Sequence, residues 1–75
     1  MSFDETTIKL AWDRADGKCE KCKKQLLWES RGKESEYGWE AHHIKAVSDG
    51  GSDKLENCKI LCQECHKRTH SFGNH

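Results

Sequence analysis

Two Cys-x-x-Cys pairs constrain the fold of this 75-residue chain more than any other feature. Together they supply four thiolates, the ligand set that zinc favours in closed structural sites: Cys19, Cys22, Cys62 and Cys65. Only 33% of the residues are hydrophobic and 35% are charged, so burial of so small a core should barely offset chain entropy. We therefore predict one zinc-stapled domain over residues 1–75. The alternative is a pair of disulfides, or thiols that bind nothing.

The odd number of cysteines indicates a reducing compartment. Five cysteines cannot all pair within the chain, and no apolar run like that of a signal peptide opens the sequence. No stretch approaches the roughly 20 apolar residues that cross a bilayer. We expect a soluble, cytoplasmic protein with no membrane partner. The leftover Cys58 is predicted to be a small buried side chain, because a catalytic thiol would need an activating neighbour.

A helix is predicted at the N-terminus, within residues 1–17. Asp4 or Thr6 can cap it, and Gly17 stands where such a helix would end. Apolar side chains recur at helical spacing, at Ile8, Ala11, Trp12 and Ala15. We expect this stripe to pack in the core against the first cysteine pair, with contact to DNA as its alternative use.

The middle of the chain is predicted to form a short strand and a loop over residues 23–36, then a clearer strand. From Tyr37 to Ile44, residues alternate with the period of two that characterises a strand. Adjacent residues of a strand point to opposite faces. His42 and His43 therefore cannot do the same job.

A loop, a strand and a helix are predicted after these two histidines. Serine, aspartate and glycine dominate residues 48–53, which indicates a surface loop, and residues 58–62 fit a strand. Residues 63–70 fit a helix, on which His66 and His70 are four apart and share a face. Imidazoles from the first of these strands and from the helix would then converge.

The histidines suit the hydrolysis of a phosphodiester, which requires a poised water and neutralisation of charge on the phosphoryl and leaving oxygens. An imidazole near its ordinary pKa suits the first requirement. A divalent ion held by three neutral histidines keeps its full charge and open positions, which suits the second. The order of the histidines and of Asn57 thus indicates a metal-dependent nuclease site.

The same residues resemble the HNH endonucleases. The resemblance rests on Trp39-Glu-Ala-His-His-Ile-Lys-Ala-Val-Ser-Asp-Gly-Gly, on Glu56-Asn-Cys-Lys-Ile-Leu-Cys-Gln-Glu-Cys-His-Lys-Arg-Thr-His70 and on both cysteine pairs, so it covers about residues 19–70. HNH domains of modification-dependent restriction enzymes and of nuclease colicins are particularly similar. The resemblance implies an α+β fold, a treble-clef-like ββα-metal domain preceded here by the N-terminal helix.

It also implies roles for individual side chains. His43 takes the position of the general base, and Asn57 takes the position that braces the loop so that the base faces the attacking water. Glu40 matches an acidic position close to the metal ligands. The products would carry 5′-phosphate and 3′-hydroxyl ends. Three histidines take the positions that bind one divalent ion: His42, His66 and His70.

One position departs from the colicin-like members of the family. Those members carry an arginine shortly before the acidic residue, where this chain has Glu36. Phosphate contacts in the transition state must then come from elsewhere, from Arg68 or from a lysine such as Lys67. A solvated helix face is the alternative for both residues.

The sequence thus predicts an HNH endonuclease that nicks or cuts DNA, duplex DNA included, with little sequence preference. Its cofactors would be a structural Zn²⁺ and a catalytic Mg²⁺, Mn²⁺, Ni²⁺ or Zn²⁺, between which the residues do not decide. A homodimer, or a place in a larger restriction or phage machinery, stays open. Zero net charge favours the main rival, a non-catalytic zinc-binding module for nucleic acid or protein. A nuclease acting on RNA is a weaker rival.

Overall fold

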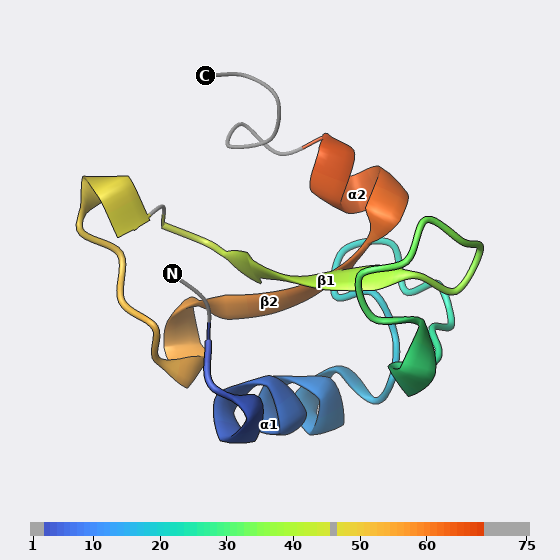
Figure 1. The fold of residues 1–75 in the computed structure, drawn as a ribbon, viewed down its shortest axis with the longest axis horizontal. Coiled ribbons are helices and arrows are strands. Elements are labelled where there is room, and N and C mark those ends of the chain that lie inside the picture. The colour runs from blue at the N-terminus through green and yellow to red at the C-terminus, as the bar shows by residue number, and fades with distance from the viewer. Residues whose placement is uncertain (1–2, 46, 69–75) are drawn as a thin grey trace.

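Two short antiparallel strands form the centre of the molecule (Figure 1). The structure is a computed structural model that describes residues 3–45 and 47–68. Strand β1 comprises Trp39–His43 and strand β2 comprises Cys58–Cys62. Because side chains alternate along a strand, each strand presents one set of residues to each face of the sheet.

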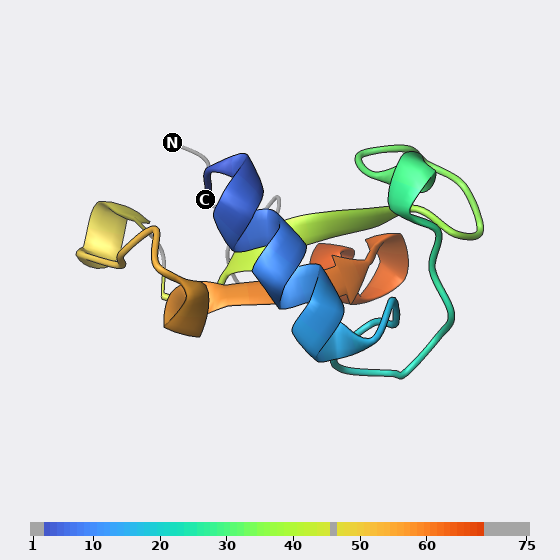
Figure 2. The same cartoon turned by 90° about the horizontal axis from the view of Figure 1, so that it is seen from below.

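Helices lie on opposite faces of this sheet, as the two views in Figures 1 and 2 show. Helix α1 comprises Glu5–Ala15 and helix α2 comprises Gln63–Lys67. The α+β class and the N-terminal helix are therefore confirmed. No helix in the described part of the chain is long and apolar enough to cross a membrane. Three turns of 3₁₀-helix also lie within the described residues, at Trp28–Ser30, Val47–Asp49 and Leu55–Asn57.

Local signals in the sequence account for both ends of α1. At its start, the carboxylate of Asp4 accepts a hydrogen bond of 2.8 Å from the backbone N–H of Thr7. At its end, Gly17 has a positive φ of 69°, and its N–H donates to the carbonyl of Trp12 at 3.2 Å. Both predictions, the Asp4 cap and the glycine stop, are confirmed.

The core lies between α1 and the sheet. Ile8 and Ala11 are buried, and Trp12 is half-buried against them, so the predicted apolar stripe does face the core. The ring of Trp12 lies 4.7 Å from that of Trp39, which is fully buried and donates its indole N–H to the carbonyl of Leu27 at 2.8 Å. The indole N–H of this buried side chain is thereby satisfied.

The predicted short strand within residues 23–36 is wrong. That stretch forms isolated bridges at Gln25 and Arg31 and one turn of 3₁₀-helix, and contains no strand. The backbone N–H of Leu26 bonds to Gly17 and that of Leu27 bonds to Tyr37, so consecutive residues pair with different segments and cannot build a ladder.

Candidate functional site

The two cysteine pairs meet in space. Their four sulfur atoms lie within 4.8 Å of one another. The sulfur atoms of Cys22 and Cys62 are 3.7 Å apart, which matches the edge of about 3.8 Å in a tetrahedron built from zinc–sulfur bonds of about 2.3 Å. No disulfide links any of the five cysteines in the structure. The cluster fits a structural zinc site, as the sequence predicts.

Backbone N–H groups favour the thiolate form of one of these cysteines, which is the form that binds metal. The N–H groups of Lys21 and Cys22 each lie 3.4 Å from the sulfur of Cys19. Burial raises the pKa of Cys19, but hydrogen bonding from Cys22, from the backbone of Cys62 and from Lys21 together outweighs burial and lowers the pKa to about 6. Burial and the neighbouring sulfur atoms instead raise the pKa of Cys65. Zinc would displace the remaining thiol protons, since only thiolates bind it.

Two imidazoles, a side-chain type that can bind metals, lie close together on the α2 face of the sheet. The rings of His42, on β1, and His66, on α2, are 5.4 Å apart and nearly perpendicular. A single ion can reach one nitrogen from each ring at this separation, because metal–nitrogen bonds are about 2.0–2.1 Å. The third predicted ligand, His70, lies outside the described residues.

The surroundings of His42 favour its neutral form. Burial lowers its pKa, and the neighbouring His66, His43 and Lys59 lower it further. Lys59 lies directly opposite His42 in the register of β1 and β2. A neutral imidazole is the form that binds metals, so the electrostatics of this face suit a ligand.

His43 has entirely different surroundings. Its Nε2 lies 2.7 Å from a carboxylate oxygen of Asp53, and its side chain is only 16% exposed. Its ring stacks on the ring of Phe3 at 3.9 Å, with 17° between the planes. The two adjacent histidines thus have separate partners, as strand alternation predicts.

Asn57 ties together the two ends of the loop between the strands. Its amide oxygen accepts from the backbone N–H of Lys45 at 2.8 Å. Its amide nitrogen donates to the carbonyls of Lys45 at 3.0 Å and Ser52 at 2.7 Å. The side chain is only 9% exposed, so these bonds form largely out of water. The loop is therefore held at the end of β1, next to His43.

The remaining predicted site residues lie around α2. A carboxylate oxygen of Glu40 is 3.3 Å from the amide nitrogen of Gln63. Lys67 forms an ion pair of 2.8 Å with Glu34 on the surface, so its charge already has a partner. Arg68 is exposed immediately after the helix.

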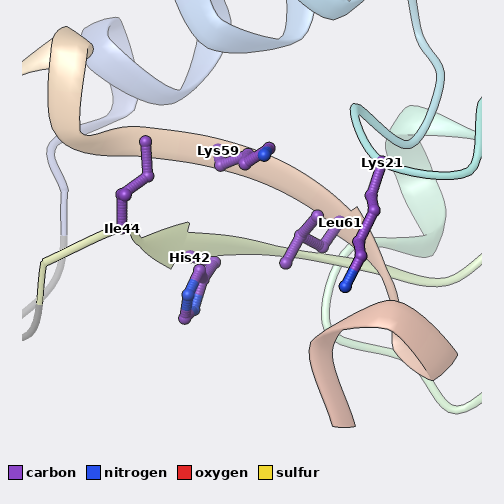
Figure 3. A pocket seen from close by; sticks show the side chains of 5 residues that line it. All are labelled: Lys21, His42, Ile44, Lys59 and Leu61. Atoms are coloured by element: carbon purple, nitrogen blue, oxygen red, sulfur yellow. The ribbon is translucent and has the colours of Figure 1, made fainter. Parts of the chain in front are cut away.

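A hollow of about 200 Å³ opens beside His42 (Figure 3). In this view Lys59 extends from β2 and Lys21 reaches in from the loop of the first cysteine pair. Neither lysine belongs to an ion pair within the part of the chain that the structure describes. The five residues that line the hollow are Lys21, His42, Ile44, Lys59 and Leu61.

Sequence reasoning missed four residues of this region. Lys59 and Lys21 were not singled out, although the strand register that pairs Lys59 with His42 follows once β2 is aligned with β1. Phe3 and Asp53 carry no local signal, because their contacts with His43 join segments distant in the chain. Asp53 is one of two aspartates in the turn-rich stretch 48–53.

Comparison with known proteins gives two findings. The sequence profile of the HNH endonuclease family matches residues 19–72. The Type IV methyl-directed restriction enzyme EcoKMcrA of Escherichia coli (strain K12) is 43% identical over 35 residues. That alignment covers 47% of this chain and 13% of the relative, so the chain spans only a small part of that enzyme.

Proposed function

Because the chain belongs to the HNH endonuclease family, we propose that it hydrolyses DNA phosphodiester bonds with a histidine base and a divalent metal. The observation that carries this proposal is the separation of the two adjacent histidines. His42 faces a second imidazole, that of His66, whereas His43 faces a carboxylate and an aromatic ring. Metal binding and proton transfer need different surroundings, and these two positions supply them.

On the α2 face, His42 and His66 would bind the catalytic ion together with His70. When bound, the ion supplies positive charge to the scissile phosphate and to the leaving 3′ oxygen. The lowered pKa of His42 supports this assignment, since the side chain stays neutral at the pH of most cells. Glu40, on the same face of β1 as His42, would steady α2 through its contact with Gln63.

On the other face, the imidazole of His43 would accept the proton of the attacking water. Asn57 supports this step by holding the loop between the strands against the backbone just after His43. The side chain of His43 is mostly enclosed, so its ring keeps one orientation. A base that is held in one orientation gives a faster reaction than a mobile one, because the reactive geometry is already formed.

The hollow beside His42 would receive the sugar-phosphate backbone. Lys59 and Lys21 have no acidic partner in the described residues, whereas Lys67 is paired with Glu34. We assign phosphate contact to these two lysines, with Arg68 as a further contact, in place of the arginine missing at Glu36. Local charge then compensates for the zero net charge of the chain.

The test is plasmid cleavage by zinc-loaded protein freed of other metals and then supplied separately with magnesium, manganese, nickel or additional zinc. We expect cleavage with at least one ion, and its loss in His43→Ala with fold and zinc content unchanged. Lys33→Ala, a substitution of an exposed side chain away from both histidines, is the control. An active His43→Ala protein would refute the base assignment.

The same experiment tests the rival functions. A folded, zinc-loaded protein that cuts nothing with any of the ions supports a non-catalytic binding module. Parallel reactions on single-stranded DNA, duplex DNA and RNA identify the substrate class. Preference for RNA would retain the chemistry proposed for the histidines and change only the substrate.

A further inference from the structure

We propose that Asp53 is a positioning residue that fixes the tautomer of His43 and leaves its Nδ1 as the nitrogen that accepts the proton. The catalytic part of this inference rests on the proposed function. Its structural part rests on the contact of 2.7 Å between Asp53 and the Nε2 of His43. No feature of the sequence singled out Asp53 for this role.

The chemistry of the two groups determines which nitrogen carries hydrogen. An ionised carboxylate can only accept a hydrogen bond, so Nε2 must donate. A neutral imidazole has a single N–H, and Nδ1 therefore keeps its lone pair. The stacked ring of Phe3 opposes rotation that would exchange the nitrogens. The base is thus held in one tautomer and one orientation.

Hydrogen bonds from Asn57 also hold the backbone on both sides of Asp53. Asn57 donates its side-chain amide N–H to the carbonyl of Ser52 at 2.7 Å and its backbone N–H to the carbonyl of Lys54 at 2.9 Å. Asn57 is thereby hydrogen-bonded to the residue before Asp53 and to the residue after it. Asn57 also accepts, on its own carbonyl, the N–H of Ile44 at 2.9 Å, next to His43. Asn57 would accordingly support the base by placing Asp53 against it.

Proton transfer strengthens this contact. When the lone pair of Nδ1 takes the proton of the attacking water, the hydroxide forms a bond to phosphorus and the imidazole becomes a cation. The bond between phosphorus and the 3′ oxygen breaks, and that oxygen takes a proton from solvent water and leaves as the 3′-hydroxyl. Its hydrogen bond to the Asp53 carboxylate is then charge-assisted. Loss of the carboxylate should slow the chemical step by about 10- to 100-fold, the effect of removing the hydrogen-bond partner that orients a metal-binding histidine.

The kinetic test compares Asp53→Asn, Asp53→Ala and Asp53→Glu on an oligonucleotide substrate with the working metal. We expect the first two to lower kcat with little change in KM, and Asp53→Glu to recover part of the rate. In the slow residual cleavage of a His43→Ala background, measured with excess enzyme, Asp53→Asn should cost nothing further, because it acts through the base. Equal losses in both backgrounds would overturn the proposal. Asp49→Asn, an exposed substitution in the same loop, is the matched control.

Long-range ¹H–¹⁵N NMR of the histidine side chains tests the inference without any cleavage. In folded, zinc-loaded protein at a pH where His43 is neutral, its ring should show the Nε2–H tautomer. Asp53→Ala should give a mixture of tautomers for His43, and Asp49→Asn should not. An Nδ1–H tautomer in the unaltered protein would overturn the inference. An inactive protein with the Nε2–H tautomer would refute only the nuclease proposal.

Discussion

At the scale of the residue, side chains of one type differ in chemistry according to the face of the sheet they occupy. His42 lies near an imidazole and an ammonium group, and burial with those positive neighbours lowers its pKa. His43, the next residue, donates to a carboxylate and stacks on a phenyl ring. The difference between their surroundings requires only the alternation of a strand.

Cys58 shows how burial controls the reactivity of a single thiol. Its side chain is fully buried, and burial raises its pKa to about 11 although the nearby Arg14 charge opposes the increase. We predict that iodoacetamide leaves Cys58 unmodified near neutral pH in the zinc-loaded protein and modifies it after unfolding. Mass spectrometry of the peptides measures this. Modification at similar rates in both states would contradict the prediction.

The same shift has a consequence for stability. The pKa of Cys58 in the folded chain lies above the ordinary value of 9.0. As pH rises through about 9, the unfolded chain loses this proton before the folded chain does, so the contribution of Cys58 to stability falls from there towards pH 11. Cys58→Ala should remove this part of the pH dependence of unfolding.

Residue types and spacing singled out many of the candidate residues that the structure brings together, and long-range contacts account for the others. The cysteine pairs, His42 and Asn57 follow from short motifs, since each motif specifies its own local geometry. Phe3 and Asp53 could not be chosen beforehand, because a phenylalanine near a terminus and an aspartate in a loop are common. Only the folded chain brings them to His43.

At the scale of the element, the first cysteine loop completes the edge of β2 and is tied there by α1. Glu20 donates its N–H to the carbonyl of Ile60 at 2.8 Å, and its carboxylate accepts the N–H of Ile60 at 2.8 Å. The guanidinium of Arg14 binds the same carboxylate through two nitrogens, at 2.6 Å and 3.1 Å. Helix, loop and strand therefore share one hydrogen-bonded group.

We predict that Glu20→Ala lowers the free energy of unfolding by about 1–3 kcal/mol, because it leaves the N–H of Ile60 and the Arg14 guanidinium without this partner. Lys9→Ala is the control, since its pair with Asp13 is 59% and 58% exposed and should contribute less than about 0.5 kcal/mol. Urea denaturation in the presence of zinc measures both. Equal effects of the two substitutions would show that the contact is unimportant.

The lysines that line the hollow lead to a separate prediction about the affinity for DNA. Lys59→Ala and Lys21→Ala should each weaken binding to all sequences and reduce the slope of log Kd against log salt concentration by about 0.9. Lys67→Ala should have a smaller effect, because Lys67 is already paired with Glu34. Fluorescence anisotropy in a His43→Ala background measures binding without cleavage. Unchanged slopes would place the DNA elsewhere.

Element prediction succeeded where the signals were local. The cap and the terminating glycine of α1 and the alternation of β1 all act within a few residues. The stretch from Leu26 to Trp28 lacks such a local signal. Leu26 is buried, whereas Leu27 and Trp28 are 40% and 38% exposed. Which of these side chains is buried depends on neighbours distant in the chain. A short apolar run does not by itself identify a strand.

At the scale of the whole molecule, cysteines of the four-cysteine cluster are also part of the apolar core. Cys19, Cys62 and Cys65 are buried with the apolar side chains of α1 and the sheet. Two of these cysteines bracket the junction of β2 and α2, and Cys19 follows α1. A metal in this cluster would therefore join the elements on both faces of the sheet. The small apolar core has little other means of holding them.

We therefore predict that removal of zinc unfolds the chain. Structural zinc contributes about 10–16 kcal/mol to folding in small zinc-binding peptides, which is as much as the whole stability of a typical domain, about 5–15 kcal/mol. A strong chelator should abolish the near-ultraviolet circular dichroism of the packed rings of Trp12 and Trp39, and added zinc should restore it. Cys19→Ser should behave like the stripped protein even with zinc present, whereas Cys58→Ala should keep one zinc ion per chain in the four-cysteine cluster. A chain that stays folded after zinc is removed would show that α1 and the sheet hold together without the metal, and the cysteine cluster would then need another explanation.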